Sequence, residues 1–317
     1  MGREGAERRD LIEDLLRGAP PIEVEGALAF LAACAAPDLS PWEAAVRGGA
    51  LADRLGHAFA AGYEAALAAL IPSRDHTRPA ALCATESGGA HPRAIATAIT
   101  HGALSGEKAF VTLGAHAQDL YVLAKVGEGE RPKLALVRVD RDAEGVVVTE
   151  LPPLPFVPEV PHARVRFEGV ERFELLPGDG WDDYVRPFRT VEDVHVHAAL
   201  LAWLAATGVR HGWPREAIER ACALLLSTRE LSGRDPSSPA THIALAGAIE
   251  LTRALVDDLE PAWASAPSAE RERWSRDRPL LEVASKARAA RLERAWQRLA
   301  DHSDAAALGD TERSVPR

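Results

Sequence analysis

Apolar residues recur at helical spacing near the start of this chain. Leu11 and Leu15 lie four positions apart, and similar pairs continue through the alanine-rich stretch that follows. Positions three or four apart face the same side of a helix, so this pattern predicts amphipathic helices. Ser40-Pro41 adds a start signal, because serine caps a helix and proline fits its first turn. Residues 1–78 are therefore expected to form a helical domain.

The middle of the chain follows a different pattern. Short runs rich in valine, leucine and aromatic residues alternate with turn signals, which is typical of β-strands. The predicted strands are Phe110–Leu113, Leu120–Val126, Lys133–Val139, Val146–Leu151 and Ala163–Phe167. Five prolines between Pro152 and Pro161 exclude helix and central strand there and indicate a fixed, extended crossing. We expect residues 79–180 to form a β-domain.

Helical spacing returns after this domain. The predicted helices are 188–209, 214–232, 238–265 and 277–301. Gly212-Trp-Pro214 interrupts the pattern, because glycine and proline end helices. Residues 181–303 are expected to form a helical bundle, and 304–317 a polar tail. The predicted fold class is α+β, with an N-terminal helical domain, a central β-domain and a C-terminal helical bundle.

Composition and charge exclude several classes of function. Hydrophobic residues make up 47% and charged residues 26%, as in ordinary soluble globular proteins. The net charge is −10 and no basic cluster occurs, which argues against nucleic-acid binding. The longest apolar run, 194–209, is interrupted by His195, His197 and Thr207. It is shorter than the roughly 20 residues that cross a bilayer, so no membrane span is expected.

The cysteines and histidines suggest neither a disulfide framework nor a metal site. Cys34, Cys83 and Cys222 are far apart and odd in number, which favours a reducing, cytoplasmic location. Glu192-x-x-His195 resembles half of a di-iron site. Such a site needs a second Glu-x-x-His motif, which the sequence lacks, so we expect no metal.

Two short motifs in the β-domain carry the most specific signal. The first reads Thr85-Glu-Ser-Gly-Gly-Ala-His91, and the second reads Ser105-Gly-Glu-Lys-Ala-Phe-Val-Thr-Leu-Gly114. They resemble the "T-E-x-G-x-G-S" and "x-G-x-K-x-[WF]-[IV]-T-x-G" motifs of the acyl-CoA dehydrogenase family, at the family's separation. The order of helices, β-domain and helices is also that of the family. The resemblance implies FAD as cofactor and an acyl-CoA or related thioester as substrate.

The resemblance also implies which residues contact the flavin. In the family the threonines matching Thr85 and Thr112 touch the flavin ring, and an aromatic residue at the position of Phe110 lies beside it. Backbone amides and small hydroxyl groups are suited to the polar edge of this ring. Glycines at the first turn allow substrate and cofactor to approach the backbone. The cofactor-binding positions that the resemblance implies are Leu82, Ala84, Thr85, Gly88, Gly89, Phe110 and Thr112.

The first motif departs from the family at three positions. Ser87 replaces a proline, Ala90 a glycine and His91 a serine. These changes weaken the expected contacts on the phosphate side of the cofactor more than those to the ring.

The catalytic base of the family lies outside the two motifs. Most members carry a glutamate on a loop between their last two helices, and this chain shows no such loop. A minority carry it on the first helix of the C-terminal domain, directly before an arginine. Here Val185 and Phe188 precede the arginines of that region, and Glu192 follows one helical turn after Phe188. Glu192 is the candidate base, and an ordinary acid in the first turns of a helix is the alternative.

Three functions remain open. The first is an acyl-CoA dehydrogenase-like flavoprotein that oxidises a thioester at its α,β-carbons. The second is a degenerate, non-catalytic family member that serves as a structural or regulatory partner subunit. The third is a flavin monooxygenase, whose chemistry needs no carboxylate base. The resemblance implies a homo-oligomer or pairing with a homologue, and leaves the electron acceptor and acyl-chain length open.

Overall fold

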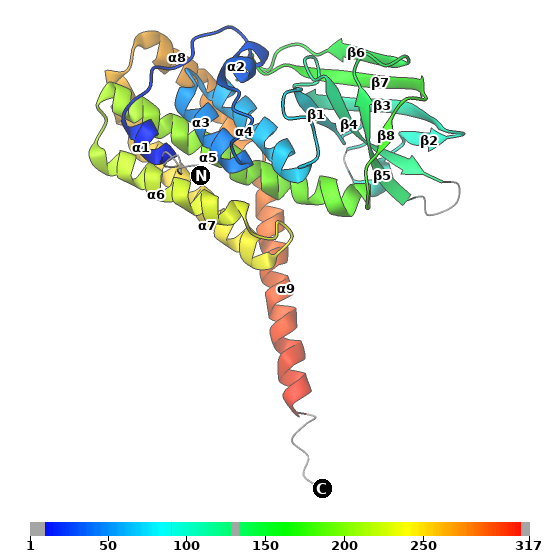
Figure 1. Ribbon diagram of the computed structural model, residues 1–317. Coiled ribbons are helices and arrows are strands. Elements are labelled where there is room, and N and C mark those ends of the chain that lie inside the picture. Colours follow the sequence, from blue (N-terminus) through cyan, green and yellow to red (C-terminus); the bar gives the residue numbers. More distant parts are fainter. Residues whose placement is uncertain (1–9, 90, 128–132, 312–317) are drawn as a thin grey trace, which may run out of the picture.

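Helices and strands occupy two separate blocks. The computed structural model describes residues 10–89, 91–127 and 133–311, with the backbone alone for 302–311. Helices from both ends of the chain form one block, and strands from its middle form the other beside it (Figure 1). The predicted α+β arrangement, with the sheet between two helical segments of the chain, is confirmed.

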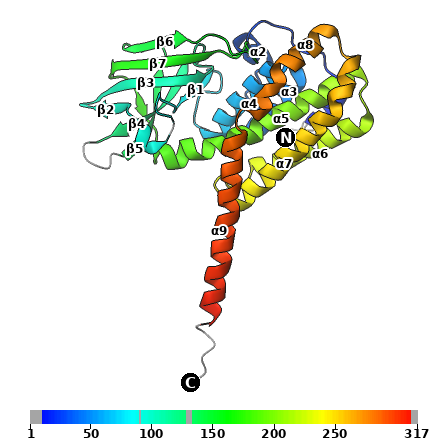
Figure 2. The ribbon, with the colours of Figure 1, turned by 180° about the vertical axis from the view of Figure 1, so that it is seen from behind.

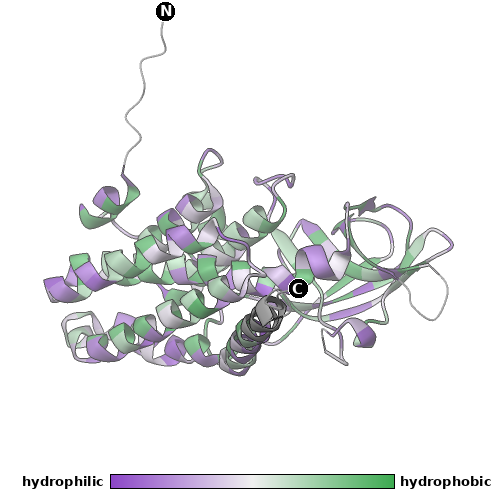
Figure 3. Cartoon of the chain, turned by 90° about the horizontal axis from the view of Figure 1, so that it is seen from below, coloured by the Kyte–Doolittle hydropathy of each residue, from purple (hydrophilic) through white to green (hydrophobic). Residues whose placement is uncertain are grey.

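The helical block contains helices from before and after the sheet. They are α1 (Leu11–Leu16), α2 (Ala27–Cys34), α3 (Pro41–Leu51), α4 (Leu55–Leu70), α5 (Arg186–His211), α6 (Arg215–Ser232), α7 (Pro239–Leu259), α8 (Ser268–Asp277) and α9 (Ser285–Thr311). Short turns of 3-10 or π-helix are η1 (Pro92–Ala94), η2 (Gly180–Val185), η3 (Glu260–Ser265) and η4 (Arg278–Glu282). Hydrophobic and hydrophilic residues alternate along the helices, as expected when one face of each is buried (Figure 3). Within the described residues, no helix is long and apolar enough to cross a membrane.

The start of α3 is fixed by the signal seen in the sequence. The Ser40 hydroxyl accepts a hydrogen bond from the Glu43 amide, and the Glu43 carboxylate accepts one from the Ser40 amide. This reciprocal arrangement satisfies two backbone donors that the helix itself leaves free. Pro41 occupies the first turn, where its missing N–H costs no hydrogen bond.

In the part of the chain that the structure describes, the other block is one sheet of eight strands. Its strands are β1 (Ala80–Cys83), β2 (Ala98–Thr100), β3 (Ala103–Thr112), β4 (Asp119–Val126), β5 (Lys133–Asp140), β6 (Val146–Glu150), β7 (His162–Val170) and β8 (Glu174–Leu175). Neighbours follow the order β6-β7-β3-β2-β4-β5-β8, and β1 pairs in parallel with β4. The side chains of β1 alternate between two cores. Ala81 and Cys83 face the core inside the sheet, whereas Leu82 contacts the core shared with the helices.

Glycines let the central helix α5 approach its neighbours at backbone distance. A Cβ atom at Gly49 of α3 would lie 2.1 Å from the carbonyl oxygen of Ala199 on α5. A Cβ atom at Gly62 of α4 would lie 2.7 Å from the Cα atom of Val196. Both distances are shorter than any tolerated contact, so α3, α4 and α5 can pack this closely only with glycine at these positions.

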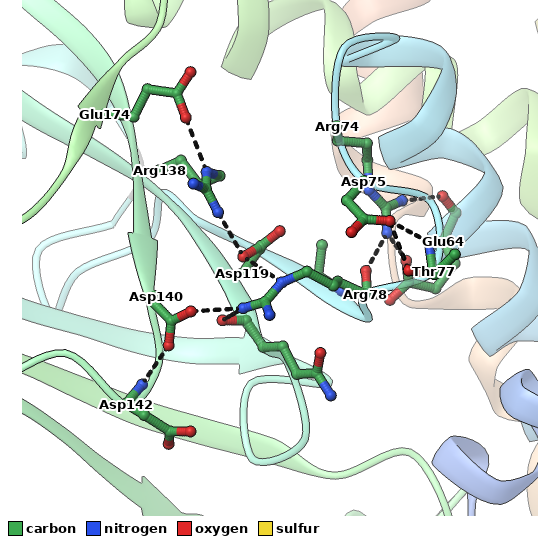
Figure 4. A network of polar contacts seen from close by, with 12 residues as sticks. Glu64, Arg74, Asp75, Thr77, Arg78, Asp119, Arg138, Asp140, Asp142 and Glu174 are labelled. Carbon is green, nitrogen blue, oxygen red and sulfur yellow. Dashed lines mark hydrogen bonds and ion pairs between the residues drawn. The ribbon is translucent and has the colours of Figure 1, made fainter.

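A polar network joins α4 to the sheet. The Glu64 carboxylate of α4 accepts a hydrogen bond from the first amide of β1 and forms a 2.7 Å ion pair with Arg74. Arg78 donates to Asp119 of β4 at 3.0 Å and to Asp140 at the end of β5 at 2.7 Å. Figure 4 shows the Arg78 guanidinium lying between these two carboxylates. The short connection from α4 to β1 is thereby held at both ends.

The last helix extends away from the rest of the molecule. α9 runs beside α7 and then projects beyond it (Figures 1 and 2). It continues to Thr311, past residue 304, where the sequence predicts a polar tail. The alanines that follow Asp304 in the sequence are strong helix formers, which agrees with this extension.

Substituting Gly62→Ala is expected to destabilise the protein by about 1–3 kcal/mol, because the new methyl group overlaps the backbone of α5. Gly247→Ala is the matched control, since a Cβ atom there meets no atom within 4 Å. This control is expected to stabilise α7 by about 0.5–1 kcal/mol through helix propensity. Urea unfolding measures both changes. Equal unfolding midpoints for the two variants would contradict the packing described.

Candidate functional site

A cavity of about 230 Å³ lies where the sheet meets the helices. Thr112 at the end of β3 and Glu192 on α5 both line it. Most of the remaining wall is apolar and includes Leu55 and Phe59 of α4 and Leu281 of η4. Two residues that the sequence assigns to different tasks, one on a predicted strand and one on a predicted helix, are thus brought to one cavity.

The two sequence motifs lie side by side and are joined by a buried ion pair. The Lys108 ammonium lies 2.7 Å from an oxygen of the Glu86 carboxylate. Lys108 is fully buried and Glu86 is 7% exposed. The amide of Ala109 donates a 2.8 Å hydrogen bond to the carbonyl of Thr85. These contacts fix the position of the first motif against β3.

Backbone amides complete the environment of Glu86. Its two carboxylate oxygens accept hydrogen bonds from the amides of Ala96 at 2.7 Å and Thr97 at 3.1 Å. Burial alone would raise the pKa of the Glu86 carboxyl, but Lys108 and these amides favour the anion, so the net pKa is lowered. Glu86 is therefore charged throughout the neutral range and acts as a structural anchor.

The first motif forms a tight turn after this anchor. Glu86 and Gly89 exchange two backbone hydrogen bonds, of 3.1 and 2.8 Å. Gly89 has a φ of +99°, a conformation that side-chain-bearing residues rarely adopt. Gly88 is exposed at the tip of the turn. The departure from the family at Ala90 falls outside the described residues.

Phe110 lies at an irregularity in β3. The register with β7 shifts between Lys108 and Val111, so one extra residue is inserted into β3. Phe110 has a φ of +51°, and its side chain is 66% exposed. A bulge re-aims the side chain it carries, and the strained backbone costs about 1 kcal/mol or more. An exposed aromatic ring held in this way is a surface suited to contact with a flat ligand.

Thr112 meets a histidine from the neighbouring strand. It is paired across the sheet with His162, and its hydroxyl lies 3.4 Å from His162 Nε2. His162 Nδ1 donates to the carbonyl of Val160 at 3.2 Å, so Nε2 is the free acceptor and the threonine hydroxyl donates to it. Burial lowers the pKa of His162, which keeps its ring neutral at neutral pH. Both residues line the cavity.

The other predicted ring contacts lie nearby but outside the cavity wall. The Leu82 amide donates a 3.0 Å hydrogen bond to the Tyr63 hydroxyl of α4. Leu82 and Ala84 pack in the core between sheet and helices, and Thr85 is half-buried. The structure therefore brings Thr112 and Glu192 together at the cavity. It places Leu82, Ala84, Thr85, Gly88, Gly89 and Phe110 on β1, on the adjoining turn and on the bulge.

Glu192 is a half-buried carboxyl on the second turn of α5. Within the described residues it has no hydrogen bond or ion pair. Burial raises the pKa of the Glu192 carboxyl to about 7, and the adjacent charge of Asp193 adds to this rise. Arg189, Arg288 and Arg291 oppose it. A carboxyl that titrates near neutrality and faces a cavity can accept a proton from a bound molecule.

Three polar residues that follow Glu192 on α5 have hydrogen-bond or ion-pair partners. Asp193 forms ion pairs with Arg288 at 2.9 Å and with Arg291 at 2.5 Å, both on α9. Burial raises the pKa of Asp193, but the arginines more than offset this and the net pKa is lowered. His195 and His197 donate through Nδ1 to carbonyls one turn earlier in α5. In the part of the chain that the structure describes, no three His, Cys, Asp or Glu side chains are grouped to hold a metal.

Sequence reasoning missed several residues of this site. His162 reaches Thr112 through strand register, which a sequence pattern does not show. Arg288 and Arg291 lie three apart on one face of α9, and this spacing is visible in the sequence. Their buried partner Asp193 is one residue after Glu192, but only the fold brings it to α9.

The fold is similar to that of several solved structures. A crystal structure described as a FAD-dependent dehydrogenase aligns over 95% of this chain and 100% of its own, with a TM-score of 0.65 and 16% identity. FkbI, for biosynthesis of the methoxymalonyl extender unit of the polyketide Fk520, aligns over 93% of both chains, with a TM-score of 0.59 and 20% identity. Glutaryl-CoA dehydrogenase from Mycobacterium smegmatis aligns over 90% of this chain and 85% of its own, with a TM-score of 0.56 and 14% identity.

These similarities establish the fold. No protein-family model matches the sequence, and no curated protein matches it. At 20% identity or less, the solved structures show that the chain has the acyl-CoA dehydrogenase-like fold, while its chemistry must be argued from its own residues.

Lys108→Met is expected to destabilise the protein by about 3–5 kcal/mol, because it leaves the buried Glu86 carboxylate without its partner. Denaturant unfolding at pH 7 measures the loss. Lys133→Met removes an exposed lysine from β5 and should change stability by less than about 0.5 kcal/mol. The double variant Glu86→Gln/Lys108→Met should be less destabilised than Lys108→Met, since no buried charge is left unpaired. A Lys108→Met protein as stable as the control would show that the pair does not anchor the motif.

Proposed function

We propose that this protein is an FAD-dependent oxidoreductase that oxidises an acyl-CoA or related thioester at its α,β-carbons, with Glu192 as the catalytic base. One observation carries the proposal. Thr112, from the motif that resembles a flavin-binding segment, and Glu192, a carboxyl with a pKa near 7, line the same largely apolar cavity. The chain's fold is shared with a FAD-dependent dehydrogenase and with glutaryl-CoA dehydrogenase, which supports the same class of reaction.

The residues present fit the ring of a flavin. Phe110 offers an uncovered aromatic surface on the bulge, and the Thr112 hydroxyl lies two residues further along β3. Gly89 holds the first motif in a turn without a side chain that would obstruct a ligand. When bound, FAD would supply the acceptor for the hydride that leaves the β-carbon. Phe110, Thr112 and Thr85 are the residues proposed to hold its ring.

The substrate's reacting carbons would lie between Thr112 and Glu192. The Glu192 carboxylate takes the α-proton, which its pKa near 7 permits because both charge states are accessible at neutral pH. Leu55 and Phe59 of α4 provide apolar surface for the acyl group and exclude water from the carboxylate. The thioester makes the α-proton acidic enough for a carboxylate base to remove it.

A visible spectrum of the purified protein, before and after addition of FAD and desalting, tests cofactor binding. Retained flavin absorption is expected. Thr112→Val should weaken FAD binding about 5–10-fold, since one hydrogen bond contributes about 1 kcal/mol. Ser227→Ala removes a hydroxyl on α6 that bonds only to its own helix, and should bind FAD as the unaltered protein does. A protein that takes up no FAD would favour the non-catalytic partner subunit instead.

Glu192→Gln is expected to lower kcat/KM for acyl-CoA oxidation by about 10²–10⁴-fold, because the amide cannot accept the α-proton. FAD binding should be unchanged. In the unaltered enzyme kcat/KM should rise tenfold per pH unit below about 7 and level off above it, since the raised pKa keeps Glu192 protonated in acid. Glu219→Gln, at an exposed α6 carboxyl, is the control. Full activity in Glu192→Gln would remove the base from the proposal, and oxygen-dependent activity without thioester oxidation would indicate a monooxygenase.

A further inference from the structure

One wall of the site comes from the far end of the chain. Leu280 and Leu281 of η4, Val283, Ala284 and Arg288 all line the cavity that contains Glu192. This wall segment, residues 280–291, joins η4 to the first turns of α9.

The wall segment is locked to the helix that carries Glu192. Arg288 Nε donates to one oxygen of the Asp193 carboxylate at 2.9 Å, and Arg291 pairs with the other oxygen. Arg288 Nη1 also donates to the carbonyl of Leu281 at 3.0 Å. A single guanidinium thus ties a wall residue of η4 to the residue that follows Glu192 on α5.

Burial strengthens the ion pairs that join the wall segment to α5. Asp193 is 7% exposed, and the side chains of Arg288 and Arg291 are 17% and 15% exposed. Charge-assisted hydrogen bonds in such surroundings are stronger than exposed ones, and removing one partner leaves a buried charge unpaired. One carboxylate faces two guanidinium groups, so the trio carries a net positive charge beside Glu192.

We propose that Asp193, Arg288 and Arg291 form a positioning clamp that holds the wall segment against α5 and sets the charge around Glu192. The role in catalysis rests on the proposed function, whereas the clamp itself is a property of the chain. Asp193 and the arginines would act through Glu192 and are not expected to touch the substrate's reacting carbons.

Asp193, Arg288 and Arg291 of the clamp all act on the charge state of Glu192, and Arg189 acts on it as well. On α5 the charged or titratable groups near it are Arg189, Asp193, His195 and His197, and Arg189 is exposed. Tyr63 of α4, His162 of β7 and the two clamp arginines of α9 face it from the elements packed against α5. Burial lowers the pKa of the three histidines, that of His197 to about 4, and raises that of Tyr63, so these four groups are neutral at pH 7.

Removing a positive charge from the clamp and removing its negative charge should therefore move the pKa of Glu192 in opposite directions. Arg291→Met removes a positive charge and should raise the Glu192 pKa by about one unit. Asp193→Asn removes a negative charge and frees two positive ones, so it should lower the pKa by a similar amount. Loss of packing or a general destabilisation would not produce shifts of opposite sign. Arg294→Met is the matched control, because Arg294 is exposed on the same helix, and it should leave the titration unchanged.

The titration can be followed without cofactor or turnover. Carbon-13 NMR of protein labelled at glutamate carboxyl carbons reports each pKa, and Glu192→Gln identifies the signal of Glu192. Hydrogen exchange of 280–291 in the same samples reports whether the wall has loosened, and faster exchange is expected in Arg288→Met and Arg291→Met. If Asp193→Asn does not fold, Arg288→Met supplies the second titration and should also raise the Glu192 pKa.

The outcomes separate this inference from the proposed function. Opposite shifts and a loosened wall in a protein that binds no FAD would support the clamp and reject the oxidoreductase. An enzyme that depends on Glu192, but whose Glu192 titration is the same in all clamp variants, would overturn the clamp and leave the reaction standing. Shifts of the same sign in Arg291→Met and Asp193→Asn would also overturn it.

Discussion

The buried ion pair between Lys108 and Glu86 is the contact on which the arrangement of the site depends. It connects the turn after β1 to the middle of β3, two segments that are not paired as neighbouring strands at this point. The regular pairing of β3 with β7 stops at Lys108, just before the bulge that turns Phe110 outward. The same residue therefore anchors the first motif and marks the start of the strained segment. An uncharged pair would be no less stable, but a charged pair buried with two amide donors accepts only one geometry.

The cavity exists because two differently built blocks meet along one helix. α5 contacts α3 and α4 so closely that glycine is required at Gly49 and Gly62, whereas larger side chains line the cavity beside this contact. Leu55 and Phe59 of α4 are among these larger side chains. Close packing thus fixes where Glu192 lies, and looser packing beside it leaves space for a ligand. Val196 of α5 takes part in both, since it meets Gly62 of α4 and also lines the cavity.

The sequence predicts the broad fold well because its signals are local. The capping residues Ser40 and Glu43 and the five predicted strands all appear in the structure. The sequence does not predict β1 and β2, because they have only four and three residues and depend on pairing, β1 with β4 and β2 with β3 and β4. The helix predicted from 277 begins instead at Ser285, because Pro279 favours the short turn η4. At the site, Thr112 and Glu192 could be named from motifs, but His162 depends on register and the clamp on tertiary contact.

The network that joins α4 to the sheet has a consequence for how a ligand reaches the cavity (Figure 4). Arg78 and Arg138 share the Asp119 carboxylate, which is 1% exposed, and Arg138 also pairs with Glu174 of β8. Arg78 lies in the connection to α4, so a hinge rotation that swung the two blocks apart would have to pull it away from this carboxylate and break the hydrogen bond from the first amide of β1 to Glu64 of α4. The blocks should therefore move as one body, and the path to the cavity should open by smaller displacements at its rim. The rate at which a ligand binds would then depend on small motions of single segments at the rim, and not on the opening of a cleft between domains.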